Sequence, residues 1–144
     1  MPSIRLSDEE MRYITLFESV TGATAKDCII DNSSNRIIFI VKKGDMGIAI
    51  GKNGVNIKRV TKLIGRPVEV VEAADTPEEL IRNVLFPAKV HAVKISRDAS
   101  GRLVAHVAVD PKDKGLAIGR EGSKIQRARM LVKRYFDVDA VVIK

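Results

Sequence analysis

Two kinds of apolar spacing recur along the chain, and each kind occurs in both halves. Apolar residues three or four apart follow the capping sequences Ser7–Glu10 and Thr76–Glu79, and this spacing predicts helices over 8–21 and 77–86. Apolar runs bounded by turn-forming residues predict strands. These runs cover 26–31, 36–41, 68–71, 88–95, 102–109 and 138–143.

A thirteen-residue string occurs twice, as GIAIGKNGVNIKR at 47–59 and as GLAIGREGSKIQR at 115–127. The copies agree at seven positions, and each is followed by helical spacing of apolar residues. The predicted strands 36–41 and 102–109 precede the strings. The separation between these two strands in the sequence is slightly smaller than the separation between the two strings, which predicts two extra residues before the string in the second copy. The order helix, strand, strand, short helix, glycine turn, helix, strand is therefore predicted twice, with a polar link at 72–76.

Composition is typical of a soluble globular protein. Hydrophobic residues make up 45% of the 144 positions and charged residues 30%, and no apolar run approaches the roughly eighteen residues of a membrane helix. The N-terminus MPSIRLSDEE is too polar for a signal peptide. The single cysteine, Cys28, lies in an apolar stretch and is predicted to be a buried thiol in a reducing compartment. We therefore expect a cytoplasmic protein without membrane association.

Positive charge is concentrated around the two strings. The net charge is +7, yet residues 42–66 and residues 112–134 carry +6 each, so the rest of the chain carries −5. Two equal basic blocks centred on matching motifs favour a polyanionic partner over a merely solvated surface. With six aromatic residues and no tryptophan, aromatic stacking surfaces are hard to assemble, and the adjacent Tyr135 and Phe136 are expected in the core.

The glycine turns have the chemistry of a phosphate site. Gly51–Gly54 and Gly119–Gly122 each join two helices within four residues, which requires backbone angles that glycine tolerates. The helix that follows offers unpaired N–H groups and the positive end of its dipole, and Lys52 or Arg120 would add a charge. An aliphatic floor beside this rim would suit unpaired bases. The apolar residues expected to form it are Ile48, Ile50, Leu116 and Ile118.

No catalytic set is recognisable, so we expect the chain not to be an enzyme. A P-loop has four residues between its glycines and then Gly-Lys-Ser/Thr, whereas Gly47 and Gly51 are separated by three and Asn53 replaces the hydroxyl. His91 and His106 could face each other across a hairpin as half of a metal site, but no third ligand lies nearby in the sequence. Solvent-facing or structural histidines are favoured, and we expect no metal and no cofactor.

The order of elements resembles a type II KH domain, and the whole chain resembles two in tandem. The strings AIGKNG and AIGREG, each with a basic helix after it, are similar to the KH pair of the NusA transcription factors, above all to the short archaeal NusA-like proteins. The resemblance covers nearly the full length. It implies an α+β fold with domains 1–73 and 74–144, each a three-stranded sheet packed with helices on one face.

The resemblance also implies binding of single-stranded RNA, about four nucleotides in each KH groove, with the GxxG loop on the backbone. It further implies a role in transcription termination or antitermination, with RNA polymerase or other transcription factors as candidate partners of a monomeric protein. Glu121 predicts unequal binding by the two loops, because a carboxylate beside a phosphate is unfavourable. The residues implied for RNA binding are Ile50, Gly51, Lys52, Asn53, Gly54, Lys58, Ile118, Gly119, Arg120, Glu121, Gly122, Lys124 and Arg127.

Two alternatives remain open at this point. A KH module could serve ribosome biogenesis or RNA processing through the same groove. An assembly protein could instead use the glycine corners only as structural turns. A steep weakening of RNA binding with salt would argue against the structural alternative, because phosphate neutralisation is salt-dependent.

Overall fold

The computed structural model describes residues 5–144, which form two compact units, one ending at Ala73 and one beginning at Ala74. The first four residues of the predicted first domain lie outside the described residues. Within residues 5–144, no helix combines the length and the apolar character that crossing a membrane requires.

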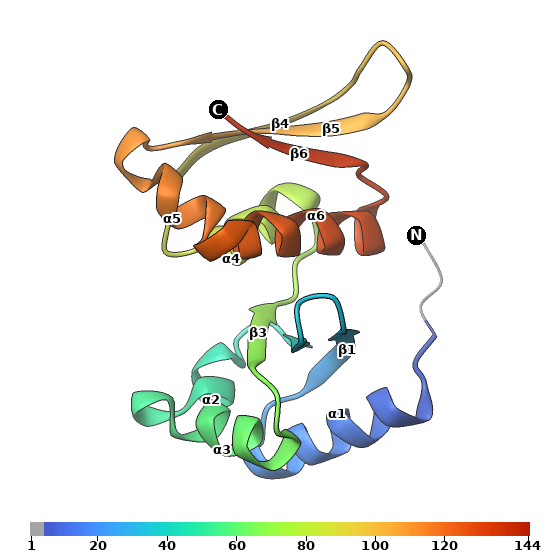
Figure 1. The fold of residues 1–144 in the computed structure, drawn as a ribbon, viewed down its shortest axis with the longest axis vertical. Coiled ribbons are helices and arrows are strands. Elements are labelled where there is room, and N and C mark those ends of the chain that lie inside the picture. The colour runs from blue at the N-terminus through green and yellow to red at the C-terminus, as the bar shows by residue number, and fades with distance from the viewer. Residues whose placement is uncertain (1–4) are drawn as a thin grey trace. The chain divides into compact units, whose positions relative to one another are not determined.

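The first unit follows the predicted order of elements. They are α1 (Asp8–Thr21), β1 (Ala25–Asp31), β2 (Arg36–Val41), α2 (Met46–Ile50), the 3₁₀ turn η1 (Lys52–Gly54), α3 (Val55–Ile64) and β3 (Val68–Glu72). β2 is the central strand, antiparallel to β1 and parallel to β3. Because parallel strands cannot be joined by a tight turn, the chain crosses from β2 to β3 through α2, η1 and α3 (Figure 1).

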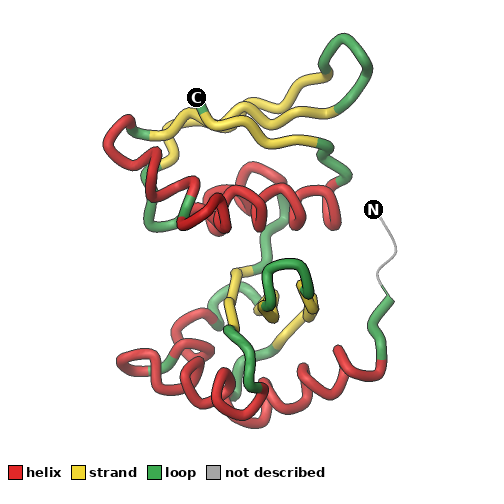
Figure 2. Tube along the Cα trace, viewed as in Figure 1, coloured by secondary structure: helices red, strands yellow, loops and turns green. Residues whose placement is uncertain are grey.

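The second unit repeats this topology. Its elements are α4 (Pro77–Leu85), β4 (Val90–Arg97), β5 (Leu103–Val109), η2 (Pro111–Asp113), α5 (Lys114–Ile118), η3 (Arg120–Gly122), α6 (Ser123–Phe136) and β6 (Ala140–Ile143). β5 is antiparallel to β4 and parallel to β6, and the helices lie on one face of this sheet (Figure 2). The α+β fold class and the pairing of each three-stranded sheet with helices are confirmed.

The helix ends form where the capping sequences predict them. Ser7 Oγ accepts a hydrogen bond from the backbone N of Glu10 (3.1 Å), and Ser7 N donates to Glu10 Oε1 (2.7 Å). Thr76 Oγ1 accepts from Glu79 N in the same way at 3.2 Å. Each cap satisfies backbone donors that the first helical turn leaves unpaired, so both units begin with a well-defined helix.

Each core lies between the helices and the sheet. In the first unit, Phe17 of α1 stacks on Phe39 of β2, with ring centroids 4.2 Å apart, and both side chains are fully buried. Cys28 is buried as predicted. In the second unit, the helices α4 and α6 contribute about half of the buried apolar side chains. Their buried side chains are Leu80, Ile81, Val84, Leu85, Ile125, Ala128, Leu131 and Val132.

Two predictions about the second half are wrong. Tyr135 and Phe136 are half-buried instead of forming core, because α6 ends at Phe136 and its last turn meets solvent. The two extra residues predicted between the second strand and the second string are also absent. Lys42 N donates to the carbonyl of Thr24 and Asp110 N to that of Lys89, so each central strand ends at the same distance before its string.

A buried ionic network closes the β1–β2 hairpin. Arg36 Nε donates to Asp31 Oδ2 at 2.9 Å, and its Nη1 lies 3.3 Å from Glu69 Oε1 of β3. Burial disfavours the charged form of Asp31, but hydrogen bonds from Ser33 and Arg36 outweigh that effect and hold the pKa of its carboxyl below the usual value. The network therefore ties all three strands of the first sheet together at one end.

Candidate nucleic-acid interface

The first glycine loop, Gly51–Gly54, turns the chain between α2 and α3. Gly51 has φ 75° and ψ 170°, a backbone region that is essentially restricted to glycine. A Cβ atom on Gly51 would lie 2.9 Å from the side-chain amide of Asn56. That amide donates a hydrogen bond of 2.7 Å from Nδ2 to the carbonyl of Ile48 on α2. Gly51 is thus required for its angles and for close packing of the loop on α3.

The second loop, Gly119–Gly122, repeats this geometry with different side chains. Gly119 has φ 80° and ψ 174°, and a Cβ atom there would lie 2.9 Å from the backbone N of Lys124. Lys124 occupies the same position in the second string as Asn56 in the first. Both loops therefore press against the second residue of the helix that follows, although the contacting side chains differ.

The third residue of each loop adopts a left-handed conformation. Asn53 has φ 57° and ψ 25°, and Glu121 has φ 55° and ψ 28°. Asparagine tolerates this region, whereas for most other L-residues it costs about 1–2 kcal/mol. The second unit thus holds Glu121 in a strained conformation, as residues at binding sites often are.

The loops leave the starts of the long helices open to a ligand. The N-cap residue is a glycine in both cases, Gly54 for α3 and Gly122 for α6, and it makes no side-chain capping hydrogen bond. The first N–H groups of such helices have no intrahelical acceptor, and the helix dipole favours an anion there. Lys52 and Arg120 are exposed beside these termini. Each corner therefore offers backbone donors and one cation to a phosphate.

Apolar side chains surround both corners. Ala49 and Ala117 are fully buried, which fixes the short helices in place, while the residues on either side of each alanine are exposed. Among the described residues, five of the nine large hydrophobic side chains that remain exposed flank the two loops. These five are Ile48, Ile50, Val55, Leu116 and Ile118. Exposed apolar groups gathered beside cationic loops fit a strand of unpaired nucleotides better than a bare structural turn.

Three cations of α3 in the first unit face solvent. Lys58, Arg59 and Lys62 of α3 are exposed. The Cε atom of Lys58 would lie 3.7 Å from a Cβ atom on Gly54, so this side chain extends along the loop. Lys58, the predicted binding residue outside the tetrapeptide, is thus brought to the corner.

The cations of the second unit are largely engaged within the unit. Lys124 Nζ donates to the carbonyl of Phe86 at 2.9 Å, and Arg127 Nη2 donates to the carbonyl of Val84 at 3.1 Å. Arg129 donates to Val141, and Lys133 Nζ bridges two carboxylates near the end of α6. The two basic blocks have the same net charge, but the second holds several of its cations against its own fold.

Two aspartates outside the glycine motifs brace the corners. Asp45 Oδ2 accepts a hydrogen bond of 2.8 Å from Thr24 N, and Asp113 Oδ2 accepts one of 2.9 Å from Lys89 N. Each aspartate precedes a short helix and holds it to the start of the first strand of its unit. Their matching positions, each two residues before its string, are the feature of the sequence that indicates this shared role.

The histidines do not form half of a metal site. In the β4–β5 register, His106 lies opposite Lys94, while His91 falls at the irregularity between Val90 and Ala92. His91 Nε2 lies 3.5 Å from Asp110 Oδ2. Within residues 5–144, no group of three or more histidine, cysteine or acidic side chains is placed to hold a metal ion.

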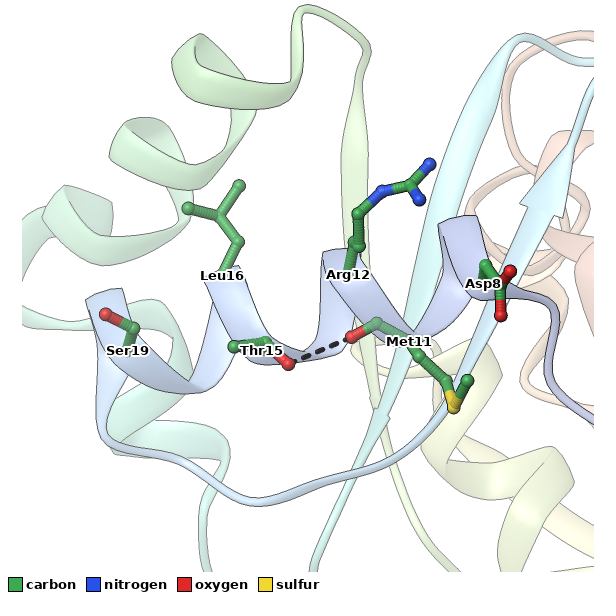
Figure 3. Close-up of a pocket in the computed structure, with 6 residues that line it drawn as sticks. All are labelled: Asp8, Met11, Arg12, Thr15, Leu16 and Ser19. Atoms are coloured by element: carbon green, nitrogen blue, oxygen red, sulfur yellow. Dashed lines mark hydrogen bonds between the residues drawn. The ribbon is translucent and has the colours of Figure 1, made fainter.

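A shallow open depression runs along the outer face of α1, a helix that contains neither glycine loop (Figure 3). Its polar groups include Asp8, Arg12 and Thr15, and the Thr15 hydroxyl is occupied by a hydrogen bond of 3.1 Å to the carbonyl of Met11. The polar lining also includes the hydroxyl of Ser19, eleven residues after Asp8 on the same helix. One carboxylate, one guanidinium and two hydroxyls arranged along a single helix form no acid–base or nucleophilic pair. The glycine corners remain the candidate site.

Comparison with known proteins agrees with this assignment. A KH domain model matches residues 11–100, and a model of the NusA-like second KH domain matches residues 77–142. A protein of Halococcus morrhuae named "Probable transcription termination protein NusA" is 46% identical over 138 residues, which is 96% of each chain. The chain belongs to the NusA-like family of KH-domain proteins. The recognition of two tandem KH domains from sequence is thereby confirmed.

Other NusA-like relatives extend the comparison. The protein of the same name from Methanocaldococcus jannaschii is 32% identical over 143 residues, or 99% of this chain and 76% of that one. The crystal structure of APE1850 is similar with a TM-score of 0.87 and 38% identity, over 96% of this chain and all of that one. The "Transcription termination/antitermination protein NusA" of Mycobacterium bovis is 32% identical over 93 residues, which are only 26% of its length.

Proposed function

We propose that the chain binds single-stranded RNA through both glycine corners and acts in transcription termination or antitermination. The observation that carries the proposal is the repeated corner itself. Each corner combines glycine-only backbone angles, a helix start with glycine at the N-cap position, an exposed cation and exposed aliphatic side chains. Family membership supports the assignment, because similar proteins carry the name of a transcription termination protein.

The corners would act as binding elements and not as catalysts. A phosphate at Gly51–Gly54 would accept hydrogen bonds from the start of α3, and Lys52 with Lys58 would neutralise its charge. The neighbouring Ile48 and Ile50 would contact the sugar and base of the same strand. Arg120, Leu116 and Ile118 would play these parts at Gly119–Gly122. Binding of this kind requires no metal and no cofactor.

Charge reversal at each loop tests the proposal. We expect Lys52→Asp and Arg120→Asp to weaken binding of a fluorescent single-stranded RNA octamer, measured by anisotropy at several salt concentrations. For single strands the slope of log K against log salt should shrink by about 0.7 for each phosphate that the variant no longer neutralises. Lys26→Asp and Lys94→Asp, at exposed strand positions, are matched controls that should keep the wild-type slope.

Unchanged affinity in both loop variants would reject the RNA-binding role of the corners. A DNA octamer of the same sequence would show whether the 2′-hydroxyl is recognised. Sedimentation would test the expected monomer. Recovery of RNA polymerase with the tagged chain, before and after ribonuclease treatment, would distinguish a direct polymerase contact from one through the nascent transcript. Recovery of ribosomal particles alone would favour the alternative role in ribosome biogenesis.

A further inference from the structure

One aromatic side chain is exposed in the second unit. Phe86 is 74% exposed, whereas the other five aromatic residues of the chain are buried or half-buried. These five are Tyr13, Phe17, Phe39, Tyr135 and Phe136. A single exposed apolar residue is common on protein surfaces, so the meaning of Phe86 depends on its position.

Phe86 lies beside the second glycine loop. It caps α4, and its carbonyl accepts the hydrogen bond of 2.9 Å from Lys124 Nζ. Lys124 is the residue on which Gly119 packs, with only 2.9 Å between its backbone N and a Cβ atom on that glycine. One lysine side chain therefore spans from the loop to Phe86. α4 also contacts α5, the short helix that presents Leu116 and Ile118.

The backbone of Phe86 is held firmly while its ring is left open. Lys124 and Arg127 donate to the carbonyls of Phe86 and Val84, which lie among the carbonyls that a helix C-terminus leaves without intrahelical donors. The backbone N of Phe86 donates to the carbonyl of Arg82 at 3.1 Å. An aromatic ring on a fixed backbone loses little conformational freedom on stacking, which favours binding of a flat partner.

The described part of the first unit, residues 5–73, has no exposed ring at this place. The residue that caps the corresponding helix α1 is Gly22, and a Cβ atom added to it would lie 3.8 Å from Ile48 of α2. The first unit has exposed cations on α3 instead, as described above. The two units thus offer different chemistry beside nearly identical loops.

We propose that the ring of Phe86 stacks on a nucleobase of the RNA strand whose phosphate lies at Gly119–Gly122. This inference rests on the proposed RNA-binding function. The second unit then gains affinity from the base, and the first mainly from the phosphates. Stacking needs no hydrogen-bond pattern and therefore tolerates any base, with a preference for the large surface of purines.

The test measures the RNA affinity of Phe86→Ala in the full chain. The substitution is made both in the wild-type protein and in Lys52→Asp, because binding by an intact first loop could mask a loss at the second. The probes are a fluorescent octaadenylate and an octamer of the same ribose-phosphate backbone without bases. We expect Phe86→Ala to weaken octaadenylate binding by about five- to a hundred-fold, to leave the abasic probe unaffected and to keep the salt slope. Phe86→Trp should retain binding, and Val142→Ala, at another exposed apolar position of this unit, is the control.

Wild-type affinity of Phe86→Ala for octaadenylate would overturn the inference, and so would an equal weakening on both probes. Either result leaves the proposed RNA-binding function standing if Arg120→Asp still weakens binding. Absence of binding by the unmodified protein would overturn both proposals together. Circular dichroism of Phe86→Ala checks that a weaker affinity does not come from unfolding, and retention by Phe86→Trp argues the same point.

Discussion

Asn56 donates a hydrogen bond of 2.7 Å from its side-chain amide to the backbone carbonyl of Ile48. This bond joins the second residue of α3 to α2 and spans the first glycine loop from one helix to the other. Once both helices are fixed, the loop between them can adopt few other conformations. The relative placement of Lys52 and the start of α3 therefore depends on a residue outside the GxxG tetrapeptide.

Asn56→Ala should loosen the first loop without unfolding the unit. Loss of one hydrogen bond lowers the free energy of unfolding by about 1 kcal/mol, and the exposed carbonyl of Ile48 can turn to water. Amide hydrogen exchange at residues 52–55 should accelerate while exchange in β2 stays slow. The control variant Ser19→Ala, on the outer face of α1, should change neither the free energy of unfolding nor the amide exchange at residues 52–55. Unaltered exchange at the loop in Asn56→Ala would show that the bond does not restrain it.

Gly51→Ala and Gly54→Ala should differ in cost although both glycines have positive φ. At Gly54 the nearest atom to an added Cβ is 3.7 Å away, so only backbone strain of about 1–2 kcal/mol is expected. At Gly51 strain combines with the clash on Asn56, and we expect roughly 3 kcal/mol or more. Urea unfolding followed by circular dichroism measures both, and equal values would contradict the packing argument.

Glu121→Asn should improve the second loop. It replaces a strained residue by one that tolerates the left-handed region and removes a carboxylate from the phosphate site. We expect a gain in unfolding free energy of about 1 kcal/mol and tighter RNA binding. The reciprocal variant Asn53→Glu should have the opposite effects in the first loop. A weaker binding of RNA by Glu121→Asn would indicate that Glu121 itself contacts the ligand.

Acid should weaken the first unit through Asp31. The pKa of this carboxyl is lowered in the folded state, so its contribution to stability is present above the unfolded value of 3.8 and is lost as pH falls through the lowered value. Arg36→Met removes the cation paired with Asp31 and costs about 3 kcal/mol at neutral pH. It should also shrink the acid-induced loss that Asp31 contributes, because without the guanidinium the folded-state pKa lies closer to the unfolded value and the two states differ less in bound protons. Urea titrations between pH 2 and pH 7, about the usual range for acid unfolding, measure this. The exposed carboxylate variant Glu9→Gln should behave as the parent.

Local signals in the sequence were sufficient for the fold. These signals each act within a few residues: the caps at Ser7 and Thr76, the glycines at helix ends and the apolar runs of the strands. The helices and strands of the structure form where these signals predict them. The offset of the strands is not evident from the sequence, because Arg36 and Arg102 look equivalent, whereas the backbone pairing of Lys42 and Asp110 sets the true alignment.

The site was less accessible to sequence reasoning. Glycine spacing indicated the corners, but not the contacts of Asn56 and Lys124, since these depend on which helix lies across the loop. The two basic blocks have equal net charge. A charge count therefore cannot show that Lys58 is exposed to solvent while Arg127 donates a hydrogen bond to the carbonyl of Val84. Phe86 could not be recognised as exposed, because a phenylalanine at a helix end is more often buried.

The backbone angles at Asn53 and Glu121 agree within 3°, although one side chain is a neutral amide and the other a carboxylate. The surroundings impose the bend, so the amino acid at its tip can vary at a cost of about 1–2 kcal/mol. One copy can then specialise in its ligand while both keep the same scaffold. A tandem protein of this design can diverge in specificity by single substitutions at two outward-facing positions.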